Sequence, residues 1–116
     1  QVLQVLVNLI TNAKNAMVEH TDCVHRLTLR IGVFSDRHSF ARFEVVDTGG
    51  GIKPENLSKL FTQGFTTRRA GHGLGLHSAA IVAKNLGGAL HAQSAGEGQG
   101  ATFTLDLPMV QLEAAA

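Results

Sequence analysis

The chain has 116 residues, which is enough for one domain with a single hydrophobic core and too few for two. Hydrophobic residues make up 44% of it and charged residues 16%, and the net charge of +1 lacks the basic excess of proteins that bind nucleic acids or membrane surfaces. No apolar run approaches the roughly 18 residues that a membrane span requires, and no signal peptide is visible. The single cysteine, Cys23, excludes an internal disulfide and a cysteine-rich zinc site.

Residues 1–19 have the periodicity of an amphipathic helix. Its predicted apolar positions, at spacings of three and four, are Leu3, Leu6, Ile10, Ala13 and Met17. The pattern is present from the first residue, without an initiator methionine or a capping residue, so we expect the chain to be a fragment of a longer protein. Residues 109–116 show no pattern and are expected to form a tail.

A second face of this helix carries polar side chains at spacings of three and four. They are Gln4, Asn8, Asn12, Asn15 and Glu19. The three asparagines therefore share one face. Asparagine is a mediocre helix former, and a solvated face usually carries lysine and glutamate instead. The row indicates either a functional surface or a solvated polar face.

Two β-hairpins are predicted from alternating patterns. Residues 26–34 alternate apolar and polar side chains in the manner of a half-buried strand, and residues 40–47 do the same after a polar turn. Residues 89–94 and 101–108 flank the glycine-rich turn AGEGQG and form the second pair. With the helices, this predicts a single α+β domain of two layers.

Asp47 ends the second of these strands. It has the parity of Phe43 and Val45, so its side chain is expected to point towards the core. A carboxylate in that position is costly unless something donates hydrogen bonds to it. Two interpretations are open: a turn aspartate ahead of TGGG, or a carboxylate at the floor of a ligand pocket.

The segment after Asp47 is expected to contain a short helix, a loop and a long helix. Pro54 suits a helix start, with an apolar side formed by Leu57, Leu60 and Phe61. Residues 62–73, rich in glycine, threonine and arginine, predict a loop.

The long helix follows the stretch AGHGLGL and is closed by Gly87 and Gly88, which suit a left-handed stop. A glycine-rich turn that opens onto a helix N-terminus can bind an anion through backbone amides. The stretch has no Gly-Lys pair, as a Walker A loop would, and its G-x-G-x-G spacing differs from the dinucleotide fingerprint. By itself it is a weak signal for phosphate binding.

Read together and in order, four motifs resemble the ATP-binding catalytic domain of sensor histidine kinases. NLITNA resembles the N box, DTGGGI the G1 box, LFTQGFTTR the F box and GHGLGLHSAAIV the G2 box. The final hairpin is also similar, so the resemblance spans residues 1–108. It implies the two-layer α/β sandwich called the Bergerat fold, with a mixed, mainly antiparallel sheet covered on one face by helices. The loop most resembles the subclass with a short ATP lid.

The resemblance implies roles for the asparagines. Asn12 would coordinate the Mg²⁺ that bridges the ATP phosphates, and a neutral carboxamide oxygen suits that hard ion. Asn8 occupies the position where related ATPases have a water-activating glutamate, so phosphotransfer is favoured over hydrolysis; Asn8 and Asn12 are the implied catalytic residues. Asn15 stands where many histidine kinases have a basic phosphate contact, with Lys14 beside it.

For the base, the resemblance implies that Asp47 accepts a hydrogen bond from the adenine amino group, so GTP would be rejected. Gly49 and Gly51 would let the backbone approach the base. Thr102 would make a secondary contact through water.

For the phosphates, the implied contacts are in the lid and the G2 box. Either lid arginine could reach the β- and γ-phosphates or stay solvated. The implied nucleotide-binding residues of this region are Arg68, Arg69, Gly71, His72, Gly73, Leu74, Gly75 and Leu76.

The resemblance also implies partners. The six histidines lack the acceptor motif of histidine kinases, so the γ-phosphate would go to a histidine on a separate dimerisation domain of the parent and then to a response-regulator aspartate. We expect a cytoplasmic domain, monomeric as a fragment, whose parent is a homodimer and is either soluble or anchored in the inner membrane. The alternatives are a serine kinase of the anti-sigma type, an ATPase, which Asn8 disfavours, and a nucleotide-binding module without activity. The alternative of a purely structural domain would not account for any of the four motifs.

Overall fold

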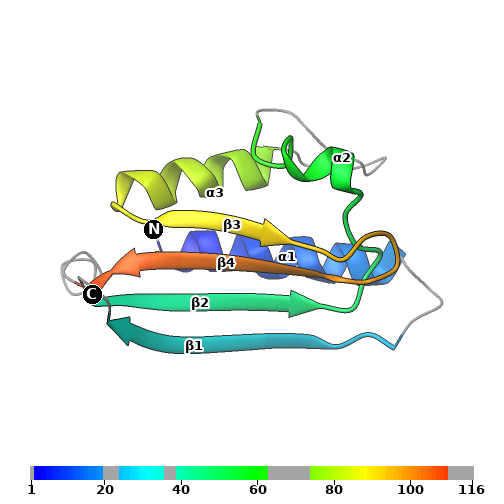
Figure 1. Cartoon of the computed structure of the whole chain (residues 1–116), viewed down its shortest axis with the longest axis horizontal. Coiled ribbons are helices and arrows are strands. Elements are labelled where there is room, and N and C mark those ends of the chain that lie inside the picture. Colours follow the sequence, from blue (N-terminus) through cyan, green and yellow to red (C-terminus); the bar gives the residue numbers. More distant parts are fainter. Residues whose placement is uncertain (1, 20–23, 36–38, 63–73, 110–116) are drawn as a thin grey trace.

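The computed structural model describes residues 2–19, 24–35, 39–62 and 74–109. Three helices and four strands are formed in these ranges (Figure 1). In chain order they are α1 (Val2–Glu19), β1 (Leu27–Ser35), β2 (Ser39–Asp47), α2 (Pro54–Leu57), α3 (Leu74–Asn85), β3 (Ala89–Gln93) and β4 (Ala101–Pro108). None of the helices within these ranges is both long and apolar enough to cross a membrane.

The strands form one sheet in the order β1-β2-β4-β3, and each described pairing is antiparallel. β1 and β2 make the first predicted hairpin, with Ser35 opposite Ser39, and β3 and β4 make the second, with Leu90 opposite Leu105. α1 runs behind the sheet in Figure 1 and α3 lies along β3. The predicted α+β architecture of two layers is therefore confirmed.

The hydrophobic core lies between the helices and the two central strands. Alternation along β2 and β4 turns every second side chain towards the helices, as a pleated strand requires. The buried strand residues are Ala41, Phe43, Val45, Ala101, Phe103, Leu105 and Leu107, and the helices contribute Val5, Leu9, Ala13, Met17, Ala79 and Ala83. Small side chains at several helical positions allow α1 and α3 to pack against each other as well as on the sheet.

The buried stripe of α1 differs from the predicted one. Val5 and Leu9 have no exposed surface, whereas Leu3, predicted to be buried, is 73% exposed. Leu6 and Ile10 lie at the margin of the core. The helix is apolar over more than half of its circumference, so periodicity alone did not identify the centre of the buried face.

The prediction that the first strand is half-buried is wrong. Leu29, Ile31 and Val33 share a face with the core residues of β2, yet they are 45%, 63% and 65% exposed. β1 is one of the two edge strands of the sheet, and the described helices pack mainly over β2, β4 and β3.

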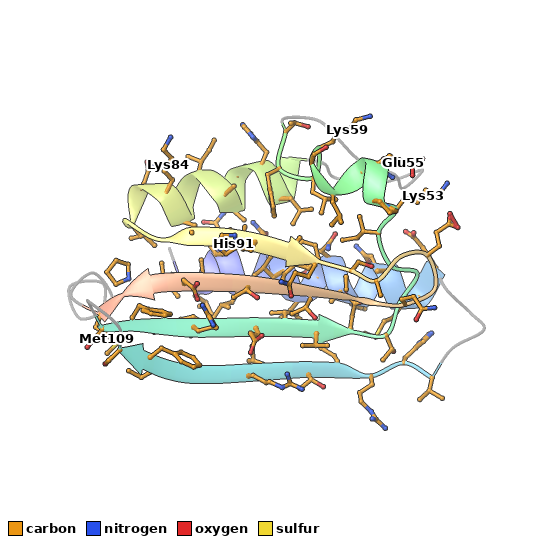
Figure 2. All side chains as sticks on the ribbon, in the orientation of Figure 1. Lys53, Glu55, Lys59, Lys84, His91 and Met109 are labelled. Atoms are coloured by element: carbon orange, nitrogen blue, oxygen red, sulfur yellow. The ribbon has the colours of Figure 1, made fainter. Side chains whose placement is uncertain are left out.

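The helix ends agree with the glycine and proline signals. α2 begins at Pro54, although it is a single turn, so Leu60 and Phe61 follow it rather than belong to it. α3 is closed by Gly87, which has φ 80°, and Gly88 donates to the carbonyl of Ala83 at 2.9 Å. Figure 2 shows the side chain of Lys84, in the last turn of α3, pointing away from the sheet.

Candidate functional site

Asp47 lies at the end of β2 with its side chain on the helix side of the sheet, as its parity predicted. It is 4% exposed and is the one buried polar side chain in the described part of the chain. Its Oδ1 accepts a hydrogen bond from the backbone N–H of Gly49 at 2.8 Å. This hydrogen bond fits the first of the two interpretations that the sequence left open, that of a turn aspartate. A turn role alone, however, does not require a carboxylate to be buried, because a turn at the surface serves equally well.

Thr48 ties the turn after β2 to the segment that leads into β1. Its hydroxyl donates to the carbonyl of Val24 at 2.5 Å and accepts from the N–H of Arg26 at 2.9 Å. The same oxygen lies 3.7 Å from Sδ of Met17 on α1. The residue after Asp47 is therefore held by the segment before β1 and by α1.

Gly49 brings this turn into direct contact with α1. A Cβ at this position would lie 2.7 Å from the carbonyl carbon of Ala16 and 2.9 Å from the nitrogen of Met17. Real Cβ atoms do not approach backbone atoms so closely, so only glycine fits unless the helix moves. The turn that carries Asp47 therefore packs against the α1 turn next to Asn12 and Asn15.

The other side of the turn is bound to the loop between β3 and β4. Gly51 has φ 74°, and a Cβ there would overlap the carbonyl oxygen of Gly96. The backbone N–H of Gly98 donates to the carbonyl of Gly50 at 2.7 Å. Residues 48–52 are thus held between α1 and the 94–100 loop.

Ser94 links the two loops, and sequence reasoning missed it. Its Oγ accepts from the N–H of Ile52 at 3.0 Å and donates to the carbonyl of Gly100 at 2.6 Å. The glycine spacing of AGEGQG was the available signal, because a loop so rich in glycine often packs against another backbone. An exposed ion pair between Lys53 and Glu97, 3.2 Å apart, bridges the same two segments.

The predicted asparagine row lies beside this turn. Asn8, Asn12 and Asn15 are each partly buried, whereas Gln4 and Glu19, the ends of the row, are exposed. A purely solvated face would leave the asparagines as exposed as those ends. The three asparagines are therefore partly covered in the structure, and their functional role stays a prediction.

The predicted lid and most of the G2 motif lie outside the described residues. This applies to Arg68, Arg69, Gly71, His72 and Gly73. Leu74 and Gly75 form the start of α3, and Leu76 packs against the margin of the core. These positions remain predictions as phosphate contacts.

Thr102 and Asp47 both line one pocket at the ends of β4 and β2, but their side chains lie on opposite faces of the sheet. Thr102 pairs with Val46 and Gln93, whereas Asp47 pairs with Ala101. Paired residues share a face, so Thr102 points to the side of the sheet away from the helices. The alternation of β4 already contained this signal, because Phe103 and Leu105 were expected to face inward.

No group of three or more His, Cys, Asp or Glu side chains that could hold a metal occurs in the ranges the structure describes. Outside such a group, Asn12 can supply a carboxamide oxygen to a metal.

The combination of fold and site defines a class of protein. The family model described as histidine kinase-, DNA gyrase B-, and HSP90-like ATPase matches residues 1–111. Since this match covers nearly the whole chain, the chain belongs to that family. It is an ATP-binding catalytic domain of the type found in sensor histidine kinases.

The individual relatives are sensor proteins. The chain is 35% identical over 111 residues to the two-component sensor PprA of Pseudomonas aeruginosa, covering 94% of this chain and 12% of PprA. It is 38% identical over 106 residues to the sensor histidine kinase ZraS of Escherichia coli K12, covering 91% of this chain and 21% of ZraS. The chain thus spans about a fifth or less of the length of these curated relatives.

Solved structures share the fold. The mycobacterial sensor histidine kinase MprB superposes with a TM-score of 0.74 at 25% identity, over 90% of this chain and 68% of that one. Full-length ShkA, solved in complex with AMPPNP, superposes with a TM-score of 0.68 at 26% identity, over 90% of this chain and 20% of ShkA.

Proposed function

We propose that this domain binds ATP with Mg²⁺ and donates the γ-phosphate to a histidine on a separate dimerisation domain of its parent protein. From that histidine the phosphoryl group would pass to an aspartate of a response regulator. The observation that carries the proposal is the burial of Asp47 on the helix side of the sheet, where its turn is held between α1 and the 94–100 loop. The relatives' names support the class of reaction.

Asp47 would select the base. Because Oδ1 already accepts from Gly49, the carboxylate is oriented by the backbone, and the adenine amino group would donate to it. A guanine presents a carbonyl oxygen at the corresponding position, which would face the carboxylate without a proton between them. ATP is therefore preferred over GTP.

Asn12 would hold the metal. Its carboxamide oxygen is a hard donor, and Mg²⁺ commonly keeps several waters and takes further ligands from phosphates, so one protein ligand is sufficient. When bound, the ion would neutralise charge on the phosphate oxygens. Asn8 lies one helical turn away on the same face and is a poor base, so this helix would position the nucleotide without activating a water for hydrolysis.

Phosphotransfer by such a domain would depend on positioning and electrostatics rather than on covalent chemistry by the protein. On this proposal residues 1–108 form the domain and 109–116 a tail. The domain works in the cytoplasm, as a monomer in isolation and within a homodimeric parent.

The test is calorimetric titration of the 116-residue chain with a non-hydrolysable ATP analogue, with and without Mg²⁺. Asp47→Asn should weaken binding about ten- to a hundredfold, because the asparagine can keep the bond from Gly49 but then points an amide donor at the adenine amino group. Asp106→Asn is the matched control, since Asp106 lies on the opposite face of the sheet, and should bind as the wild type does. Equal affinities for ATP and GTP analogues, or full affinity in Asp47→Asn, would contradict the proposal.

A further inference from the structure

Ser94, the first residue after β3, is a hydrogen-bonding junction between two loops. Its Oγ accepts from the backbone N–H of Ile52 at 3.0 Å and from that of Gly96 at 3.2 Å. It donates to the carbonyl of Gly100 at 2.6 Å, which is closer than the carbonyl of Gly96 at 3.3 Å. A hydroxyl has one proton and two lone pairs, so its hydrogen-bonding capacity is used within the protein. The hydroxyl of Ser94 therefore acts on the two loops rather than on a ligand.

A continuous series of hydrogen bonds leads from this hydroxyl to the carboxylate of Asp47. The first bond is the one from Ser94 to the carbonyl of Gly100. The N–H of Gly100 then donates to the carbonyl of Gly49 at 3.2 Å. The N–H of Gly49 in turn donates to Oδ1 of Asp47 at 2.8 Å. The position of the carboxylate therefore depends on where the 94–100 loop lies.

Steric contact links the same loop to Asp47 directly. Gly100 is buried, and a Cβ there would overlap the main-chain carbonyl oxygen of Asp47. A further bond joins the two segments at Gly98, whose N–H donates to the carbonyl of Gly50 at 2.7 Å. Figure 1 shows the connection between β3 and β4 turning back beside the end of β2. The loop thus supports one side of the Asp47 turn, and α1, which contacts Gly49, supports the other.

The composition of the loop explains why it needs a side chain to hold it. Three of its seven residues are glycines, which have the greatest conformational freedom of any residue. The hydroxyl of Ser94 contacts the first and the last of these glycines, so it restricts the loop at both ends. A binding site whose parts are held in place before the ligand arrives loses less entropy on binding.

We propose that Ser94 is a specificity-determining positioning residue: by fixing the 94–100 loop, it holds the carboxylate of Asp47 where that carboxylate distinguishes adenine from guanine. It acts through Gly100 and Gly49 and does not touch the ligand. This inference rests on the proposed function.

A residue that only stabilised the fold would behave differently from a positioning residue. Its loss would weaken the binding of every nucleotide by the same factor. Loss of a positioning residue changes the ratio between adenine and guanine nucleotides, because both the adenine contact and the rejection of guanine depend on the place of Asp47.

Three variants separate these roles. Ser94→Ala removes the hydroxyl from Ile52 and Gly100, whereas Ser94→Thr keeps a hydroxyl at the same position. Gln99→Ala is the matched control in the same loop: its side chain is exposed, and the bond from its backbone N–H to the carbonyl of Gly96 is retained.

The experiment titrates the 116-residue chain and the three variants with non-hydrolysable ATP and GTP analogues in the presence of Mg²⁺. We expect Ser94→Ala to bind the ATP analogue about five- to thirtyfold more weakly and the GTP analogue within about twofold of wild type, so that the preference for adenine falls. Ser94→Thr and Gln99→Ala should keep both affinities within about twofold. An equal loss for both analogues in Ser94→Ala, or an unchanged preference, would overturn the proposal. Absence of binding in the wild type would instead refute the proposed function.

A second measurement tests the hydrogen-bonded series without a nucleotide. Amide hydrogen exchange in the wild-type chain should show protection at Ile52, Gly98 and Gly100, whose N–H groups donate between the two loops. In Ser94→Ala these amides should exchange at least about tenfold faster, while that of Phe103, between its two partner strands, is unchanged. Rapid exchange of the three amides in the wild type, or an equal increase at Phe103, would overturn the proposal even if the nucleotide binds.

Discussion

β1 and β4 have the same alternating pattern and very different surroundings. Phe103, Leu105 and Leu107 of β4 are at most 2% exposed, whereas Ile31 and Val33 of β1, which point to the same side of the sheet, are more than half exposed. β4 has a strand on either side and packs against α3, whereas β1 has one described neighbouring strand and forms one of the two edges of the sheet. Alternation thus identifies which side chains share a face, and the neighbours determine whether that face is buried.

The test of this contrast with the largest expected effect is a pair of substitutions to alanine, one in β4 and one in β1. Leu105→Ala should lower the free energy of unfolding by about 2–5 kcal/mol, because it opens a cavity under fully packed neighbours. Ile31→Ala removes a similar volume from a side chain that is 63% exposed and should cost less than about 1 kcal/mol. Urea denaturation of both variants measures the difference, and similar costs would show that β1 is as well packed as β4.

A second test concerns the face of the sheet that points away from the helices, where a side chain of β2 contacts both β1 and β4. Arg42 of β2 makes a two-point contact with Asp106 of β4, at 2.8 and 3.0 Å, and its guanidinium lies 4.9 Å from the ring centroid of Phe34 in β1. The hydrogen bond to Asp106 raises the pKa of Arg42 above its ordinary value, and the Coulombic attraction of that carboxylate acts in the same direction. The arginine therefore stays charged throughout the range in which the protein would be studied.

Double-mutant cycles should give a larger coupling for Arg42 and Asp106 than for the exposed pair Lys53 and Glu97, whose single contact is expected to contribute less than about 1 kcal/mol. The coupling is measured by denaturation at low salt and again at high salt. Equal coupling free energies for the two pairs, with an equal decrease at high salt, would show that the two-point geometry contributes no additional stability.

The smallest expected effect is on β1 alone. Val33→Thr keeps the branched side chain that suits a strand and removes an apolar group that is 65% exposed, so stability should change by no more than about 0.5 kcal/mol. Light scattering at rising concentration should show less self-association, because the apolar surface beside a free strand edge is reduced. Unchanged scattering would mean that this face does not drive association.

The sequence was most informative where a local rule was strong. Strand alternation predicted both hairpins and the inward side chain of Asp47, and Gly87 marked the end of α3. It was least informative where the answer depended on a distant neighbour. Nothing near His77 in the chain indicates that its ring reaches the Phe61 carbonyl.

The site shows the same division. The glycines after Asp47 suggested a close approach of backbones, yet the partners of that approach, α1 and the 94–100 loop, are set by tertiary packing. Thr102 is a different case: the alternation of β4 predicts its outward direction, and its contact with the base through water stays a prediction.

The contact between Gly49 and α1 has a consequence for inhibitor design. A compound that obtains its affinity from the main chain of residues 49–51 would rest on positions where the protein has few viable substitutions. A side chain at Gly49 would collide with the backbone of Ala16, and one at Gly51 with that of Gly96, so a change that repels the drug would also disturb the fold. On the proposed function, resistance would have to arise at other positions around the nucleotide, where side chains can vary without moving a backbone.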